Sequence, residues 1–137
     1  MIVEIITTGT ELLLGHIVNS NAAILSQFAN RLGFDVFYHT SVGDNKIRMK
    51  EVFKIALSRA DIIITSGGLG PTLGDITKEV SAELLDLKLE LHQESKARIE
   101  NFFKKRNREI TPNNLRQAMI HHGAIAVKNN FGTAPGV

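Results

Sequence analysis

The sequence predicts an α/β protein with a largely parallel β-sheet and helices on both faces of that sheet. Segments rich in β-branched apolar residues alternate along the chain with segments of helical periodicity. The runs at residues 2–7 and 61–65 are apolar almost throughout, as strands buried on both faces of a parallel sheet are. Glycine-containing polar turns follow the strand-like runs, and right-handed crossovers would bring these turns to one edge of the sheet.

Length and composition indicate one domain over residues 1–137, with 43% hydrophobic and 22% charged residues. A net charge of +2 is too small to indicate a nucleic-acid partner. The chain has no cysteine, which excludes disulfides and thiolate metal sites and fits a cytoplasmic location. No apolar run approaches the ~18–20 residues that span a bilayer, and no basic leader precedes the first strand. We therefore expect no membrane partner.

The first half of the chain is expected to hold three strands with two helices between them. β-branched residues predict strands over residues 2–7, 34–42 and 61–65. Apolar residues at helical spacing predict helices over residues 22–32 and 45–58. We expect the second helix to be capped by Asp44, and the first by one of Asn19, Ser20 and Asn21. The core-facing residues of the first helix are expected to be Ile24, Leu25, Phe28 and Leu32.

The second half is expected to be mainly helical. Periodicity predicts helices over residues 75–85, 93–106 and 112–121. Thr111 followed by Pro112 is typical of a helix start, with a hydroxyl at the N-cap and proline at the first helical position. A short strand over residues 124–127 and a loop over residues 129–136 complete the chain. The buried stripe of the middle helix is expected to be Ile99, Phe102 and Phe103.

The turn after the third strand is the most informative stretch. Gly67, Gly68 and Gly70 allow positive φ and leave room for a ligand to approach the backbone. Amides of such a turn and of the following helix start can point together at an anion. Asp75 is placed to hold a divalent cation against phosphate oxygens, which makes it the candidate catalytic and metal-binding residue. The alternative is a plain tight turn with Asp75 in the first turn of a helix.

Polar turns follow all three expected strands of the first half. Because the carboxyl ends of parallel strands meet at one edge of a sheet, these turns are expected to converge. Together they offer backbone amides, hydroxyls and carboxylates for an anionic, phosphorylated ligand held with a metal ion. The candidate ligand-binding residues are Thr8, Gly9, Thr10, Glu11, Asp44, Asn45, Ser66, Gly67, Gly68, Gly70, Thr72, Thr77 and Lys78.

Several polar residues have a structural alternative. Asp44 is equally well placed to cap a helix, and Lys78 is explained either as a phosphate counter-charge or as a solvated helix-surface lysine. His121 and His122 would point about 100° apart on a helix, which favours a helix-end pair over a metal site. The basic cluster at residues 96–108 is interrupted by glutamates, which favours a solvated helix face over a nucleic-acid surface and leaves a role in oligomer contacts open.

Six short motifs occur in order along nearly the whole chain. They are TGTELLLG at residues 8–15, IVNSN at 17–21, VGDN at 42–45, GGLGPT at 67–72, TPNN at 111–114 and GTAPG at 132–136. Together they resemble the N-terminal domain of the CinA (competence/damage-inducible protein) family, which is related to the MoaB/Mog molybdopterin-binding domains. The resemblance implies a three-layer α/β/α sandwich that binds a nucleotide or pterin phosphate at its strand ends.

The resemblance implies two functions. Members of the CinA branch hydrolyse nucleotide pyrophosphates such as ADP-ribose with Mg²⁺, Mn²⁺ or Co²⁺, assisted by potassium. Members of the Mog branch bind or adenylylate molybdopterin. We therefore expect a metal-dependent nucleotide pyrophosphatase that hydrolyses ADP-ribose-type substrates, in a chain that forms a homo-oligomer. The alternative is a molybdopterin- or nucleotide-binding module with little or no turnover. A third alternative is an interaction domain with a vestigial pocket.

Two departures from the family pattern bear on that choice. After Pro-Thr the family usually has two adjacent aspartates, whereas here Gly74 precedes Asp75. Loss of a second metal-binding carboxylate would weaken hydrolysis more than binding. The family domain also continues past the Ala-Pro-Gly motif, whereas this sequence ends at Val137. The resemblance therefore implies a domain cut short at its C-terminus.

Overall fold

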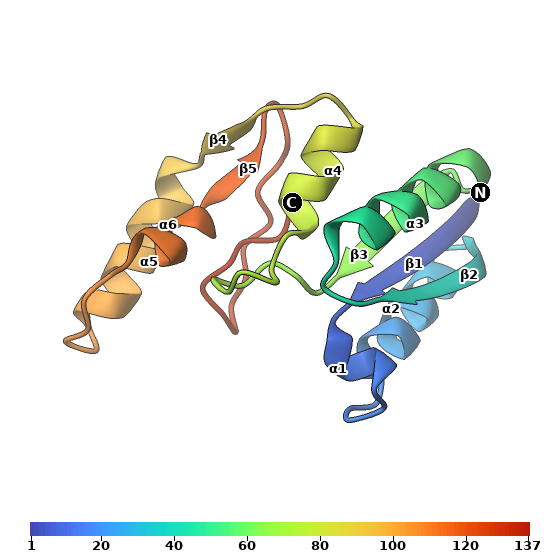
Figure 1. Ribbon diagram of the computed structural model, residues 1–137, viewed down its shortest axis with the longest axis horizontal. Helices are drawn as coiled ribbons and strands as arrows, with labels where there is room; N and C mark the ends of the chain where they lie inside the picture. The colour runs from blue at the N-terminus through green and yellow to red at the C-terminus, as the bar shows by residue number, and fades with distance from the viewer. The chain divides into compact units, whose positions relative to one another are not determined.

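The computed structural model describes residues 1–137 and places them in two units, Met1–Gly68 and Leu69–Val137, each with a sheet of its own (Figure 1). A single domain over residues 1–137 remains a prediction. No helix in either unit combines the length and apolar character needed to cross a bilayer.

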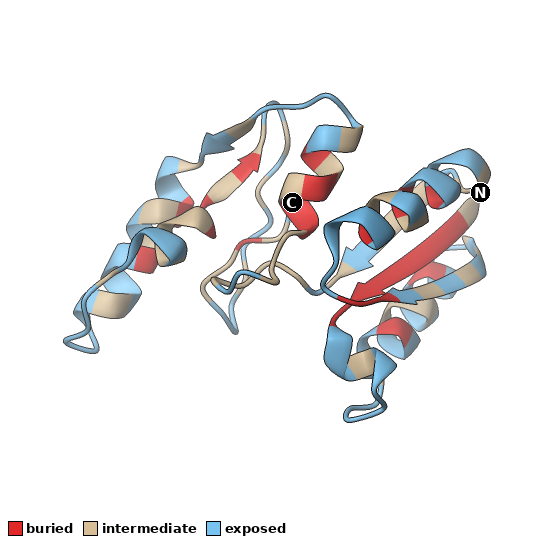
Figure 2. Cartoon of the chain, viewed as in Figure 1, coloured by how far each residue is buried: buried red, intermediate tan, exposed pale blue.

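The first unit is built on a parallel sheet with the strand order β2-β1-β3. The central strand β1 (Ile2–Thr8) pairs with β2 (Asp35–Val42) on one side and with β3 (Ile62–Ser66) on the other. All of β1 after its first residue is buried, which explains its nearly continuous apolar sequence (Figure 2). The predicted α/β fold with a parallel sheet is confirmed.

Helices cover both faces of this sheet (Figure 1). α2 (Ser20–Arg31) packs on the face that carries Val3 and Ile5, and α3 (Lys46–Arg59) lies on the other face. The short α1 (Thr10–Leu13) follows β1 directly. The buried side chains of α3 are Met49, Phe53 and Ala56. The first unit therefore has the three layers expected from the sequence.

α2 faces the sheet with smaller side chains than expected. Ala22 and Ala29 are buried, whereas Ile24, Phe28 and Leu32 are 52%, 58% and 70% exposed. The prediction that these three residues face the core is wrong. The helix carries two apolar stripes at helical spacing, and the stripe with the alanines is the one that lies against the strands.

A buried ion pair joins the centre of the sheet to α3. Glu4 is fully buried in β1, and its carboxylate accepts hydrogen bonds of 2.8 Å from Nε and 2.8 Å from Nη2 of Arg59. The hydroxyl of Thr40 donates a third bond of 2.6 Å. The bonds from Arg59 lower the pKa of Glu4, and burial opposes this only in part. Three donors thus allow a charged group to lie inside the unit.

The second unit contains a two-stranded antiparallel sheet and three helices. β4 (Leu89–Leu91) pairs with β5 (Met119–His121). The helices are α4 (Thr77–Leu84), α5 (Gln93–Lys104) and α6 (Pro112–Arg116). The buried apolar side chains of this unit include Val80, Ala82, Ile99, Ala118 and Ile120, and Figure 2 shows several buried positions in α4.

The second unit corrects several predictions. The helix expected over residues 112–121 ends at Arg116, because residues 119–121 pair with a strand at residues 89–91 that the sequence did not predict. The strand expected over residues 124–127 is reduced to a single bridge between Val127 and Gly136. Three-residue strands carry too little periodicity to be recognised, and their partners lie far away in the sequence.

Candidate functional site

A cavity of about 210 Å³ lies within the first unit, at the carboxyl ends of β1 and β3. The first turns of α1 and α2 and the segment between these helices form the rest of its wall. Ligands of open parallel sheets bind at this edge, so the cavity lies where the sequence predicted a site. The polar neutral side chains of the wall are Thr7, Thr8, Asn19, Ser20, Asn21 and Ser66.

Two asparagines fix the start of α2 against the strand ends. The side-chain amide of Asn21 donates a hydrogen bond of 2.9 Å to the hydroxyl of Ser66. The amide of Asn19 donates a bond of 2.9 Å to the hydroxyl of Thr7, and its carbonyl oxygen accepts from the backbone N–H of Ala22 at 3.2 Å. Asn19 is therefore the N-cap among the three predicted candidates. The positive end of α2 is held beside the cavity.

In the glycine turn after β3, positive φ is found at Gly67 and Gly68 but not at Gly70. Gly67 has φ +103° and Gly68 has φ +67°. A Cβ atom at Gly67 would collide with the carbonyl oxygen of Thr8, so this position requires glycine for space as well as for conformation. Gly70 leaves room for the side chain of Asp75, since a Cβ atom at this position would lie only 2.7 Å from Oδ2 of Asp75.

Glu11 is the one charged side chain in the wall of the cavity. Its carboxylate lies over Gly9, where a Cβ atom would come 2.5 Å from Oε1. Leu12, Ile17 and Val18 add an apolar part to the wall. The cavity therefore offers a carboxylate acceptor, hydroxyls and amides, and it has no lysine or arginine with which to neutralise a phosphate.

Thr10 and Asp44 bond to each other near the end of β2. Oδ2 of Asp44 accepts from the backbone N–H of Thr10 at 3.1 Å and from its hydroxyl at 3.0 Å. Asn45 caps α3 by accepting from the backbone N–H of Arg48 at 3.1 Å. The capping role expected for Asp44 is therefore wrong, because its carboxylate turns towards Thr10. None of these residues lines the cavity.

In the second unit, Asp75 organises its own loop. Its Oδ2 accepts from the backbone N–H of Thr72 at 2.9 Å and also from the Thr72 hydroxyl. Burial tends to raise the pKa of Asp75, but the bonds from Thr72 and the backbone of Gly70, with the charge of Arg116, outweigh it and the pKa is lowered. Hydrogen bonds donated by its own loop therefore favour the charged form of this carboxylate.

Arg116 closes the same loop from α6, a role that sequence reasoning missed. Its Nη2 donates to the carbonyl oxygens of Thr72 at 2.8 Å and Asp75 at 2.6 Å. Its Nε lies 3.4 Å from Oε1 of Glu79, whose other oxygen is buried without a hydrogen-bond partner. A single arginine in a short helix gives no signal in the sequence that could have identified these contacts.

The residues present do not form a metal site by themselves. No group of three or more histidine, cysteine, aspartate or glutamate side chains comes together in either unit. The carboxylate of Asp75 already accepts from three donors of its own loop. Coordination of Mg²⁺, Mn²⁺ or Co²⁺ by Asp75, with assistance by potassium, remains a prediction.

Lys78 corrects another expectation. Its side chain is buried, and Nζ donates to the carbonyl oxygens of Gln117 at 2.8 Å and Met119 at 2.7 Å. Burial lowers the pKa of Lys78; the charge of Glu79 raises it, and that of Arg116 lowers it further. The interpretation of Lys78 as a solvated lysine on the helix surface is therefore wrong. The ammonium joins α4 to the segment that enters β5, and Thr77 beside it is buried as well.

The structure brings one part of the predicted site together. Thr8, Glu11, Ser66 and Gly67 line the cavity of the first unit. Gly9, Thr10, Asp44, Asn45 and Gly68 belong to the same unit but do not line it, whereas Gly70, Thr72, Asp75, Thr77 and Lys78 belong to the second unit. Asn19, Ser20 and Asn21 also line the cavity, although the sequence predicted only a capping role for them. Three consecutive polar residues at a helix start were the signal that could have placed them in the site.

Comparison with known proteins identifies relatives over nearly the whole chain. Residues 4–137 match a family described as "Probable molybdopterin binding domain". A "CinA-like protein" from Dictyoglomus thermophilum is 52% identical over 98% of this chain and 33% of its own length. A "Putative competence-damage inducible protein" from Bacillus subtilis is 49% identical over 98% of this chain and 32% of its own length. The chain thus spans about a third of the length of these curated relatives.

Solved structures of related proteins have a similar fold. The protein CinA from Thermoplasma acidophilum, described as being of unknown function, aligns with a TM-score of 0.87 at 34% identity, covering 98% of this chain and 79% of that one. The molybdopterin biosynthesis enzyme MoaB from Thermus thermophilus aligns with a TM-score of 0.60 at 22% identity, over 88% of this chain and 78% of that one, which shows a shared fold. The chain belongs to the family of probable molybdopterin-binding domains, among its CinA-like members.

Proposed function

We propose that this chain is a binding module for a pterin or nucleotide, and that the cavity of the first unit takes part of that ligand. The observation that carries the proposal is the position of the cavity at the ends of two parallel strands, beside the N-terminus of the twelve-residue helix α2. The family description and the MoaB-like fold support a ligand of this class.

The wall favours the ring or sugar part of such a ligand. Hydroxyl and amide groups both donate and accept hydrogen bonds, as the polar edge of a pterin or a ribose requires. The carboxylate of Glu11 accepts bonds from ring N–H or sugar O–H groups, but it repels a phosphate. The volume of about 210 Å³ is below the roughly 300–1,000 Å³ of complete small-molecule sites, so the cavity holds part of the ligand.

Binding without rapid turnover is favoured over hydrolysis of ADP-ribose. Gly74 stands where the family pattern has a carboxylate, and the carboxylate of Asp75 accepts bonds from its own loop. Metal-dependent pyrophosphatase activity would need a bound cation, and the carboxylate of Asp75 has no second carboxylate beside it to help hold one. Assembly into a homo-oligomer is a further prediction, to be tested by sedimentation equilibrium.

Calorimetric titration of the full chain with a reduced pterin phosphate and with ADP-ribose tests the proposal. Glu11→Gln should weaken binding by about tenfold, since it replaces a charge-assisted hydrogen bond with a neutral one. Glu51→Gln is the matched control, because Glu51 is exposed on α3 and does not line the cavity. Equal affinities of the two variants for both ligands would overturn the assignment of this cavity. A parallel assay for AMP release with Mg²⁺, Mn²⁺ or Co²⁺ distinguishes binding from hydrolysis.

A further inference from the structure

The second unit has a larger cavity that the proposed function does not use. Its volume is about 370 Å³, and it lies between α5 and the loop at residues 129–133. It shares no residue with the cavity of the first unit. Its volume falls within the roughly 300–1,000 Å³ of complete small-molecule sites.

One wall is a cationic and aromatic face of α5. Arg98 and Phe102 are four residues apart and lie on one side of α5 (Gln93–Lys104), and Arg106 follows in the turn just after the helix. The guanidinium carbon of Arg106 lies 3.7 Å from the centre of the Phe102 ring. The rings of Phe102 and Phe103 pack edge to face, with their centres 5.6 Å apart. Phe102 is 37% exposed, so its expected place in the core is wrong. The pair Phe102–Arg106 forms a flat platform.

The facing wall is a loop held by Asn129. The carbonyl oxygen of its side chain accepts from the backbone N–H groups of Phe131 at 2.9 Å and Gly132 at 3.1 Å, and its amide donates to the carbonyl of Ala134 at 2.9 Å. Arg98 donates to the backbone carbonyl of Asn129 at 2.6 Å, which ties the loop to α5. These bonds specify the shape of the loop before any ligand arrives.

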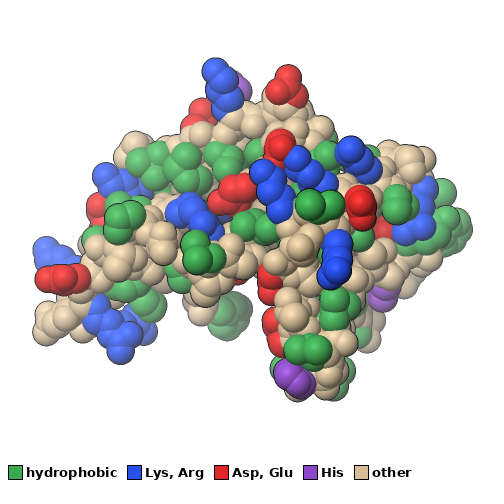
Figure 3. All heavy atoms as spheres, viewed as in Figure 1, with side chains coloured by type: hydrophobic (Ala, Val, Ile, Leu, Met, Phe, Trp, Pro, Cys, Tyr) green, Lys and Arg blue, Asp and Glu red, His purple; other side chains and the backbone are tan.

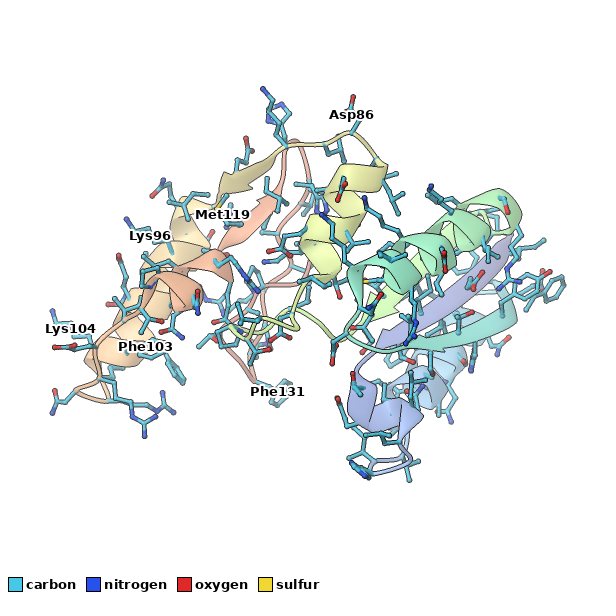
Figure 4. The ribbon with its side chains drawn as sticks, in the orientation of Figure 1. Asp86, Lys96, Phe103, Lys104, Met119 and Phe131 are labelled. Atoms are coloured by element: carbon cyan, nitrogen blue, oxygen red, sulfur yellow. The ribbon has the colours of Figure 1, made fainter.

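The loop presents an uncovered aromatic ring. Phe131 is fully exposed in a segment with several hydrogen bonds, and its side chain projects from the loop (Figure 4). Exposure of a whole phenylalanine ring to water is unfavourable relative to its burial. A flat ligand that covers the ring would recover part of this free energy.

The charge around the cavity is positive. Two guanidinium groups line it, and no carboxylate does. Lysine and arginine side chains gather near the end of α5 in the space-filling view (Figure 3). An arginine guanidinium binds a phosphate or carboxylate through two parallel hydrogen bonds and stacks on flat rings with its face.

We propose that this cavity binds a small aromatic anion, the chemical class to which nucleoside monophosphates belong. The ring stacks on the Phe102–Arg106 platform and Phe131, and the anionic group accepts hydrogen bonds from Arg98 and Arg106. Both halves of the ligand contribute to binding, since the wall carries aromatic rings as well as guanidinium groups.

Adenosine monophosphate, adenosine and inorganic phosphate are suitable probes with the full ¹⁵N-labelled chain. Adenosine monophosphate should shift the backbone amides of Asn130 and Gly132 and bind at least tenfold more tightly than either of the other probes. Arg106→Gln and Phe131→Ser should each weaken this binding about tenfold. The matched controls, Arg108→Gln and Phe37→Ser, alter exposed residues outside the cavity and should leave it unchanged.

Three outcomes would overturn the proposal. The first is the absence of shifts at these loop amides up to millimolar adenosine monophosphate. The second is equal weakening by Arg106→Gln and Arg108→Gln, which would indicate attraction to the general charge of the surface. The third is binding of inorganic phosphate that is as tight as that of the nucleotide and is unaffected by Phe131→Ser. This result would indicate a site that binds only the anionic group and does not stack the ligand's aromatic ring. Because the readout is confined to residues of the second unit, these outcomes do not depend on the cavity of the first unit.

Discussion

The side-chain amide of Asn21 donates a hydrogen bond of 2.9 Å to the hydroxyl of Ser66, across 45 residues of sequence. It connects the first turn of α2 to the carboxyl end of β3, and both residues line the cavity of the first unit. Together with the bond from Asn19 to Thr7, it holds the wall in place without a ligand. A preformed wall reduces the free energy needed to order side chains on binding.

Gly67→Ala should destabilise the protein and abolish ligand binding in the first unit. Besides the strained φ of +103°, the new Cβ would collide with the carbonyl oxygen of Thr8 in the central strand. Gly33→Ala is the matched control, since Gly33 has φ +80° but open space around its Cβ position. That substitution should cost only about 1–2 kcal/mol of conformational strain. Thermal unfolding and calorimetric titration compare the two, and an equal loss of stability would contradict the collision.

Glu4→Gln should lower the free energy of unfolding by about 2 kcal/mol. The substitution removes the buried counter-ion of Arg59 and replaces the charged acceptor of the Thr40 hydroxyl with a neutral amide. The loss is smaller than for a pair buried on both sides, because the Arg59 side chain is 34% exposed. Urea unfolding at pH 7 measures it, with Glu51→Gln as the exposed control. A loss below that of the control would show that the buried pair contributes nothing.

Stability should fall on acidification. The folded chain lowers the pKa of both Glu4 and Asp75, so the folded state binds protons less readily than the unfolded state does. Their contribution is complete above the ordinary carboxyl range near about pH 4 and is lost as the pH falls through the lower folded pKa values. Urea unfolding at several pH values should show this slope in the wild type and a shallower one in Glu4→Gln. Parallel slopes would contradict the role of Glu4.

Lys78→Met should lower the melting temperature without changing ligand affinity in the first unit. The substitution leaves the carbonyl oxygens of Gln117 and Met119 without their buried donor, which costs about 1 kcal/mol or more. Lys88→Met, at an exposed position of the same unit, is the control. Retained stability with weaker ADP-ribose binding would favour the phosphate contact predicted from the sequence.

Features that depend on neighbouring residues were predictable. The buried strand β1, the parallel sheet of the first unit and the positive φ of Gly67 and Gly68 follow from local composition and turn chemistry. The face of α2 was not predictable, because the helix carries two apolar stripes and only contact with the strands selects one.

Features that depend on distant partners were not predictable. β4 and β5 are too short to show a pattern and form by pairing across the second unit. Lys78 was expected in solvent or at a phosphate because its two carbonyl partners lie 39 and 41 residues away. The same holds for the bonds of Asn19 and Asn21, which turn two helix-cap candidates into part of the cavity wall.

The most direct test of the central claim is a titration of the ¹⁵N-labelled full chain with a reduced pterin phosphate and with ADP-ribose, followed by amide chemical shifts. At least one ligand should shift Ser20, Asn21, Ser66 and Gly67 in a saturable manner, and Asn21→Ala should weaken that binding several-fold. Gln27→Ala, at an exposed position of the same helix, should not. Shifts confined to other residues, or none with either ligand, would contradict a binding site at the strand ends of the first unit.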